Sequence, residues 1–570
     1  MFFFFKVLRL VVSTSGFFVG PQKNMKPLLL VVGSASADFL WGTATASYQV
    51  EGYRTKDERQ PSVWDAFDTD LSTVIRNVRP DGSARVYKGQ TGAHADEDYK
   101  RFDETAELVS DLGFDVARIS VSWGRVMTYN AAGEFVSVNE AGLAHYSEVV
   151  ASFRKKGVLI ALTMFHWDLP LVFEEKAHRE GSESAWLSRE GWLQDEFKRY
   201  AELLYSRFSD DIAYWITLNE PLTIVQNGYS GAGNHAPGRC SDRNACYAGD
   251  DAVEPYIAAK NLILAHAAMF EAWNDAGKPG SGCGITLNGD GCVPFTAKDE
   301  AAATRCLEFQ IPLFYDPIFY GKWPDSVNNA VQSRPIQNWD WTQKELDIVK
   351  GSHDSKHFFT NTYTSRFVQN VENARGWSFG SDPVALQSGY NFTSGAPIGT
   401  PSSNGWLFNY GKGIRTLLNW YDDRYPNRTF IVTENGWGNA TQKTINQDLD
   451  DTERCLYYRD YVTNVSAAVV DDDLSVAAYF AWSVLDNFEW ADGYSTRFGL
   501  VYVDYHTQLR TPKNSARYFQ NFITNATDIA QLRHLLPPSD TDLAFRKKPL
   551  LLNQGENLLL GSPEPPSSLL

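Results

Sequence analysis

The sequence predicts an α/β fold, a single closed (β/α)8 barrel with elaborated βα loops. Eight apolar segments rich in Val, Ile, Phe and Tyr have the character of strands, and amphipathic segments with helical periodicity lie between them. Parallel strands need crossover connections, so strands that alternate with helices indicate a parallel sheet. No repeat of about 20–50 residues is visible in the sequence, which argues against a solenoid or a propeller.

The eight expected strands favour closure into a barrel over an open sheet. A doubly wound open sheet is the alternative, and it would place a Gly-rich turn after its first strand. The stretch from Gly42 to Gln49 contains no GxGxxG pattern. The expected strands are Asp38–Ala46, Asp115–Ser122, Val158–Phe165, Ile212–Thr217, Cys283–Asn288, His357–Tyr363, Thr429–Thr433 and Val476–Trp482.

Helical periodicity occupies the segments between these strands. In the first helical segment, for example, Tyr99 and Phe102 fall on one apolar stripe. Local caps agree, because Asn139 precedes one helical segment and Gly113 follows another. The expected helices are Asp98–Leu112, Glu140–Lys156, Asp195–Phe208, Glu254–Ala276, Glu300–Leu313, Gly411–Tyr425 and Thr452–Val470.

Composition excludes several classes of protein. The 52 Lys and Arg residues face 69 Asp and Glu residues, and the net charge of −17 disfavours binding to nucleic acid or anionic membranes. With 43% hydrophobic and 21% charged residues, the chain can bury a large core and is not globally disordered. The aromatic content of 14% fits either flat ligands or the filling of that core.

The two ends of the chain differ from its middle. Residues 1–37 are expected to be a leader: Met25 is a second candidate start, and Lys26, an apolar run and Ala35-Ser-Ala37 resemble a secretory signal with its cleavage site. This predicts a secreted, extracellular protein. Residues 38–530 are expected to form the barrel, and 531–570 a poorly ordered tail. No run approaches the roughly 18–20 apolar residues of a membrane span.

The six cysteines are few for a chain of this length. Cys240 and Cys246 close a small polar loop and are expected to pair in an exported protein, with free thiols as the alternative. No CxxC spacing or His cluster accompanies them, so no zinc or other metal site is expected. Glycosylation sequons give weak further support for export, at Asn391, Asn427, Asn439, Asn464 and Asn525.

Polar side chains and indoles alternate where the expected strands end. In this architecture chemistry lies at the C-terminal ends of the strands. Amides and carboxylates can hydrogen-bond the hydroxyls of a sugar, and an indole can stack on its C–H face. The sequence therefore predicts a sugar-binding cleft. The strand-end groups are Gln49, Arg118, His166, Trp167, Asn219, Glu220, Asn361, Tyr363, Glu434, Trp482, Glu489 and Trp490.

Two of these groups, Glu220 and Glu434, predict glycosidic bond cleavage. They end the fourth and seventh expected strands, before Pro221 and before Asn435-Gly436. Cleavage needs one carboxyl to protonate the leaving oxygen and another to meet the developing oxocarbenium charge.

At these residues the chain resembles glycoside hydrolase family one, of the β-glucosidase type, from Phe39 to about Tyr518. Thr217-Leu-Asn-Glu-Pro221 is similar to the acid/base motif of that family, and Ile431-Val-Thr-Glu-Asn-Gly436 to its nucleophile motif. Further stretches match in order: Phe39-Leu-Trp-Gly-Thr-Ala-Thr-Ala-Ser-Tyr48, His166-Trp-Asp-Leu-Pro170, His235-Ala-Pro-Gly-Arg239, Ala481-Trp-Ser-Val-Leu-Asp-Asn-Phe-Glu-Trp490 and Arg497-Phe-Gly-Leu-Val-Tyr-Val-Asp-Tyr505.

The resemblance implies a role for each matched residue. Glu434 is the implied nucleophile and Glu220 the implied acid/base, with Arg118 and Tyr363 beside Glu434. Net retention and a carboxyl separation of roughly 5–5.5 Å follow. The resemblance implies no metal or organic cofactor, and small β-glycosides or short oligosaccharides as substrates. The implied substrate-binding residues are Gln49, His166, Asn219, Tyr363, Trp406, Trp482, Glu489 and Trp490.

The aglycone side of the resemblance is its weakest part. Trp406 resembles the aglycone-side Trp of the family, with loop packing as the alternative. The segment 174–190 is longer and more polar than the family pattern. The sixth strand reads Phe359-Thr-Asn-Thr-Tyr363 where the family has Gly-Leu-Asn, although the spacing of Asn361 and Tyr363 is kept.

Other activities of the same barrel are alternatives to a β-glucosidase. A transglycosidase, a β-galactosidase and a β-fucosidase share these residues. A phospho-glycosidase is disfavoured because the carboxylate of Glu489 would repel a sugar phosphate. Thioglucosidases usually lack the acid/base Glu, so Glu220 argues against that activity. Sugar-binding pseudoenzymes typically lose one of the two carboxylates, and this chain has both Glu220 and Glu434.

Overall fold

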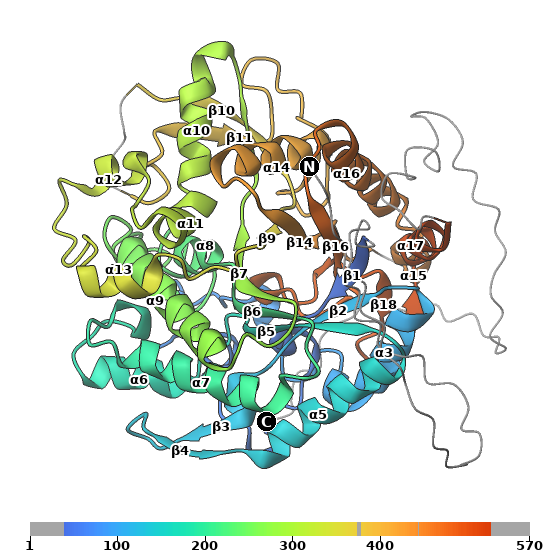
Figure 1. Cartoon of the computed structure of the whole chain (residues 1–570), viewed down its shortest axis with the longest axis horizontal. Coiled ribbons are helices and arrows are strands. Elements are labelled where there is room, and N and C mark those ends of the chain that lie inside the picture. Colours follow the sequence, from blue (N-terminus) through green and yellow to red (C-terminus); the bar gives the residue numbers. More distant parts are fainter. Residues whose placement is uncertain (1–38, 373–377, 443, 526–570) are drawn as a thin grey trace, which may run out of the picture. The chain divides into compact units, whose positions relative to one another are not determined.

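The structure, a computed structural model, describes residues 39–525 except 373–377 and 443. Eight parallel strands close into a barrel in the order β1-β16-β14-β9-β7-β6-β5-β2, which confirms the predicted fold (Figure 1). The expected leader and tail lie outside the described residues. The barrel strands are β1 (Leu40–Ala44), β2 (Val116–Ser120), β5 (Leu159–Phe165), β6 (Tyr214–Asn219), β7 (Gly282–Asn288), β9 (His357–Asn361), β14 (Thr429–Asn435) and β16 (Val476–Trp482).

Two strands run two residues further than expected. β6 ends at Asn219, so Glu220 follows it directly, and β14 continues through Glu434 to Asn435. The pairing of β14 with both neighbours shifts register after Val432. Such an irregularity bends a strand locally and re-aims its side chains.

Side chains from six strands fill the inside of the barrel as a separate cluster, which includes Tyr214, Phe359 and Phe480. Gly42 on β1 and Gly284 on β7 leave room for two of these rings. A Cβ atom at Gly42 would lie 2.3 Å from the ring of Phe480, and one at Gly284 would lie 2.7 Å from that of Phe359. The barrel is therefore a packed core, as this architecture requires.

Long helices pack around the barrel, and adjacent ones contact each other, as α7 does α9 and α14 does α16 (Figure 1). They are α3 (Asp98–Asp111), α5 (Glu140–Lys155), α7 (Trp192–Phe208), α9 (Glu254–Asp275), α11 (Ile311–Tyr320), α14 (Lys412–Arg424), α16 (Thr452–Asp471) and α17 (Asn514–Asn525). The expected cap is present, because the Asn139 side chain accepts from the backbone N–H of Ala141 and Gly142. Gly113, with φ of 84°, follows α3 as expected.

One expected helix is wrong. The segment 300–313 is two helices, α10 (Glu300–Glu308) and α11, broken at Gln310. Pro312 lies in the first turn of α11, where a residue without an N–H fits, whereas in the interior of one long helix it would remove a hydrogen bond.

Short elements make up the loops. The shorter helices are α1 (Ser47–Val50), α2 (Val63–Asp68), α4 (Trp123–Val126), α6 (Leu171–Arg179), α8 (Pro221–Thr223), α12 (Asp325–Val331), α13 (Gln343–Val349) and α15 (Ile445–Leu449). The strand pairs are β3 (Met127–Tyr129) with β4 (Phe135–Val138), β12 (Thr400–Pro401) with β13 (Phe408–Asn409), β15 (Asn439–Ala440) with β17 (Thr496–Arg497), and β18 (Val501–Val503) with β19 (Arg510–Pro512).

A second sheet stands outside the barrel. It has the order β11-β10-β8, formed by β8 (Gly291–Pro294), β10 (Ser365–Asn370) and β11 (Ala385–Ser388). A disulfide between Cys292 and Cys306 ties β8 to α10. The sequence did not predict this bond, whereas the expected pairing of Cys240 with Cys246 is confirmed.

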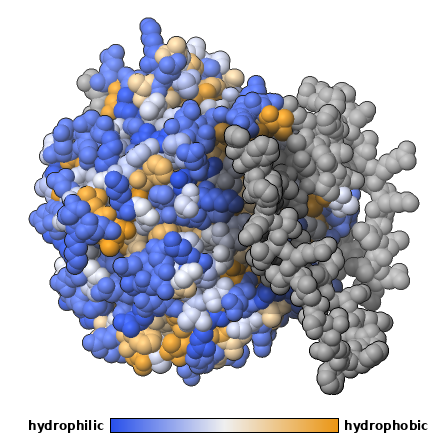
Figure 2. All heavy atoms as spheres, in the orientation of Figure 1, coloured by the Kyte–Doolittle hydropathy of each residue, from blue (hydrophilic) through white to orange (hydrophobic). Residues whose placement is uncertain are grey.

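One face of the described part of the chain is mostly polar. Figure 2 shows a face that is largely hydrophilic, with apolar residues in small separate patches. Among the described residues, no helix is both long enough and apolar enough to cross a bilayer. The same residues contain no group of three or more His, Cys, Asp or Glu side chains placed to hold a metal ion.

Candidate active site

The C-terminal ends of the barrel strands surround a cavity of about 590 Å³. Both Glu220 and Glu434 line it. Glu220 has φ of 46°, in the left-handed region, where it turns the chain from β6 into α8. A non-glycine residue in that conformation is strained, and such strain is concentrated at functional sites.

The carboxylate of Glu434 is held by a cation and a phenol. One oxygen, Oε1, pairs with Nη1 of Arg118, and Oε2 accepts a hydrogen bond of 2.5 Å from the hydroxyl of Tyr363. A cation and a phenol hydroxyl are the partners that hydrogen-bond a carboxylate most strongly. Burial and the charge of Glu434 raise the pKa of Tyr363 well above its usual value, so the phenol keeps its proton and remains a donor.

Glu220 has neutral partners instead. Its Oε1 accepts from the Asn361 side chain at 2.7 Å, and its Oε2 accepts from the Thr223 hydroxyl at 2.8 Å. Burial, together with the nearby charge of Glu434, raises the pKa of Glu220 to about 8. At neutral pH one carboxyl of the pair therefore carries a proton and the other has the partners of an anion, which is the division of labour that acid/base catalysis needs.

The inner wall of the cavity is formed by His166, Asn219, Trp482, Glu489 and Trp490. Four of them are buried, and Glu489 is partly buried. Burial, with the charge of Arg118, holds the pKa of His166 well below its usual range, so the imidazole is neutral. Its Nε2 lies 3.1 Å from the amide nitrogen of Asn219 and acts as the acceptor, which assigns the ring proton to Nδ1. That buried Nδ1 has no partner among the described residues and can donate to a ligand.

Gln49 lies behind this wall rather than in it. Its Nε2 is 3.0 Å from both the Asn487 side-chain oxygen and the backbone oxygen of Phe488, and 3.3 Å from Oε2 of Glu489. Its Oε1 is buried and has no partner among the described residues. Burial and the neighbouring acids raise the pKa of Glu489 well above its usual value. Gln49 thus fixes Glu489 in place and keeps one acceptor unused.

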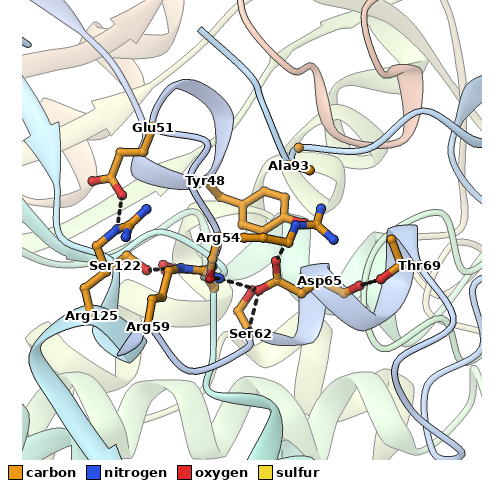
Figure 3. Close-up of polar contacts among 12 residues, drawn as sticks. Tyr48, Glu51, Arg54, Arg59, Ser62, Asp65, Thr69, Ala93, Ser122 and Arg125 are labelled. Carbon is orange, nitrogen blue, oxygen red and sulfur yellow. Dashed lines mark hydrogen bonds and ion pairs between the residues drawn. The ribbon is translucent and has the colours of Figure 1, made fainter. Parts of the chain in front are cut away.

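A cluster of buried charges supports Trp490. The Tyr48 ring lies parallel to the Trp490 indole, with the centroids 6.0 Å apart, and its hydroxyl donates to Asp68 at 2.8 Å. Figure 3 shows Arg54 directed toward Asp65. Arg54 forms ion pairs of 3.4 Å with Asp65 and 3.1 Å with Asp68. With the phenol of Tyr48 anchored by these charges, the indole that packs against it has little freedom to move.

The outer wall of the cavity has a different character. We define it as Gln226, Asn227, Asp290, Arg366, Gln387 and Trp406, all of which line the cavity. Trp406 is 37% exposed, and its ring contacts Tyr363 edge to face at 6.0 Å. Exposure at a cavity mouth fits the ligand-contacting alternative for Trp406 better than loop packing.

The structure brings most of the expected residues to one cavity. Gln49 and Arg118 are not among its lining residues, but Gln49 contacts Glu489 and Arg118 pairs with Glu434. The sequence did not single out Thr223, although it follows Glu220 at the three-residue spacing typical of the first turn of a helix. Asn361, which ends β9, was expected as one of the strand-end groups of the cleft but without a role of its own, and the structure shows it donating to Glu220.

Comparison with known proteins agrees with this geometry. Residues 33–527 match the model of the glycosyl hydrolase family 1. The chain is 35% identical over 499 residues to β-glucosidase 34 of Oryza sativa subsp. japonica, covering 86% of this chain and 92% of that protein. It is 36% identical over 494 residues to β-glucosidase 1B of Phanerodontia chrysosporium, covering 85% of each.

Solved structures give the same result. The crystal structure of a family-one β-glucosidase from the fungus Humicola insolens in complex with glucose superposes with a TM-score of 0.76 at 35% identity. The match covers 86% of this chain and 99% of that one. With the family match over most of its length, the barrel and the paired carboxyls, this chain belongs to glycosyl hydrolase family 1 and is a glycoside-cleaving enzyme.

Proposed function

We propose that the protein is a retaining β-glucosidase that removes terminal non-reducing β-D-glucosyl residues from small glycosides. The observation that carries this proposal is the unequal treatment of two carboxyls in one cavity. Glu434 has the charged and phenolic partners of an anion, while Glu220 has a pKa of about 8 and is protonated at neutral pH. The names of the relatives and the glucose complex of the similar fungal enzyme support glucose as the sugar.

The reaction takes place in two displacements. In the first, a Glu434 oxygen bonds to the anomeric carbon as the bond to the leaving oxygen breaks, and Glu220 gives its proton to that oxygen. Esterification removes the charge of Glu434, and with it one of the causes that raise the Glu220 pKa. Glu220 can then take a proton from water as the water oxygen bonds to the anomeric carbon and the bond to Glu434 breaks, which releases β-glucose and restores the Glu434 carboxylate.

The sugar is held by the inner wall. We assign Trp482 and Trp490 to its apolar face, and Glu489, Asn219, the neutral His166 and Oε1 of Gln49 to its hydroxyls. The buried Gln49 Oε1 and His166 Nδ1, which have no partner among the described residues, support this assignment. Burying such atoms without a partner is costly, so a ligand that pairs with them binds more tightly.

Azide rescue tests the two catalytic roles. Glu434→Ala should lose activity by several orders of magnitude and, with azide, yield the α-glucosyl azide. Glu220→Ala, with an activated aryl glucoside and azide, should yield the β-glucosyl azide. The product anomers are assigned by NMR. Wild-type rates in either variant, or the same anomer from both, would overturn the assignment.

We also propose that the protein is exported. The disulfides Cys240–Cys246 and Cys292–Cys306 suit an oxidising compartment, and the segment ending at Ala37 resembles a signal. Expression of the full chain in a yeast should place the enzyme in the medium with its N-terminus near Asp38. Retention in the cytoplasm with an intact N-terminus would contradict this proposal.

A further inference from the structure

Arg366 is the arginine of the outer wall, and it lines the cavity. It lies on β10 and is partly buried. Val368, two residues along, pairs with Gln387 across the β10–β11 ladder. Directly opposed residues and residues two apart share one face of a sheet, which explains why Arg366 and Gln387 both line the cavity.

The guanidinium of Arg366 has no acidic partner. Nη2 donates to the backbone oxygen of Trp406 at 3.1 Å, and no ion pair links Arg366 to any described residue. By contrast, the buried Arg118, Arg125 and Arg334 pair with Glu434, Glu51 and Asp382 respectively. A partly buried cation that no ion pair neutralises favours an anionic ligand, and a planar guanidinium favours a carboxylate.

An aromatic surface lies next to this cation. The hydrogen bond from Arg366 is to Trp406 itself, whose exposed indole lines the same cavity. A ligand ring lying against the indole would thus have the guanidinium within reach of a substituent on that ring. Aromatic stacking supplies area, and the cation supplies selectivity between charged and neutral substituents.

Asp290 is an acidic residue of the outer wall whose carboxyl interacts with the charge of Arg366. It lines the same wall, and its Oδ1 accepts weak hydrogen bonds of 3.3 Å from the backbone N–H groups of Tyr363 and Thr364. Burial raises the pKa of Asp290, and the charge of Arg366 opposes that change. Asp290 therefore competes only in part for the charge of Arg366, and its removal should strengthen attraction of an anion.

We propose that the enzyme prefers β-glucosides whose aglycone is an aromatic ring bearing a carboxylate. Trp406 lies against the ring, and Arg366 pairs with the carboxylate. This inference rests on the proposed β-glucosidase activity and specifies the aglycone, which neither catalytic carboxyl determines.

The test compares 4-carboxyphenyl with 4-carbamoylphenyl β-D-glucoside, two substrates of similar shape that differ in charge. We measure the ratio of their kcat/KM values in wild type and in variants, so that the different leaving-group abilities cancel. Arg366→Gln should lower the ratio about tenfold, which is the magnitude of one charge-assisted hydrogen bond. Arg366→Lys should recover part of it, and Asp290→Asn should raise it.

A binding measurement on the wild type is independent of how the variants fold. Benzoate should inhibit more strongly than benzamide, and added salt should reduce the difference. If wild type hydrolyses neither glucoside, the proposed function itself fails. If it hydrolyses both, but Arg366→Gln leaves the ratio unchanged or benzoate and benzamide inhibit equally, only the aglycone inference is overturned.

Discussion

At the inner wall of the cavity, Glu489 is held by Gln49, and Trp490 packs on a phenol anchored by Asp68. At the outer wall, Trp406 is 37% exposed and Arg366 forms no ion pair with another described residue. The inner wall has its geometry fixed before any ligand arrives, which suits a sugar of one shape. The outer wall keeps unused hydrogen-bonding capacity at the solvent boundary, which suits groups that differ between substrates.

The largest expected loss of activity follows substitution of the acid/base carboxyl, Glu220. Glu220→Gln should lower kcat for phenyl β-D-glucoside about 10³-fold, because the phenoxide then leaves without a proton. The loss should be far smaller for the 2,4-dinitrophenyl glucoside, which needs little protonation. Steady-state kinetics with both substrates measures this, and equal losses would mean that Glu220 is not the acid.

Substitution in the inner wall should act on every substrate alike. We expect Glu489→Ala to lower kcat/KM about 100-fold, since it removes hydrogen bonds to the sugar and leaves sugar hydroxyls unpaired. The factor should be the same for 4-carboxyphenyl and 4-carbamoylphenyl glucosides. A loss that depends on the aglycone would contradict the assignment of Glu489 to the sugar.

Substitution in the outer wall should act on the aglycone alone. Trp406→Ala should raise KM for phenyl β-D-glucoside about fivefold by removing a stacking surface. Methyl β-D-glucoside, which has no ring, is the matched control and should change less than twofold. Equal changes in KM for both glucosides would mean that Trp406 has a structural role and does not contact the aglycone.

The smallest effect concerns the proton on Glu220. With a pKa of about 8, the carboxyl is protonated at neutral pH, so kcat/KM should fall as pH rises through about 8. Thr223 donates to the ionised form, so Thr223→Val should raise the Glu220 pKa further. The alkaline limb should move to higher pH by less than about one unit, with the acid limb unmoved. A shift to lower pH would contradict the role of Thr223.

The barrel and the inner wall were predictable from the sequence for one reason. All eight strands are apolar runs, and the groups that end them, such as Glu220 and Trp482, stand where the architecture places chemistry. The break between α10 and α11 was missed although Pro312 signals it. The Cys292–Cys306 bond joins two loop elements that only the fold brings together.

The outer wall was not predictable in the same way. Arg366 belongs to β10 and Gln387 to β11, and the pairing of these strands follows from no periodicity in the sequence. Whether Arg366 forms an ion pair depends on which acidic side chains lie near it in the folded chain, and the sequence alone does not give those positions.

The sheet β8-β10-β11 has a consequence for how such an enzyme diverges. It shares no strand with the barrel, so residues such as Arg366 and Gln387 can be exchanged without disturbing a barrel hydrogen bond. Descendants of this chain could thus acquire new natural substrates through a few mutations on one hairpin while the catalytic centre is inherited intact.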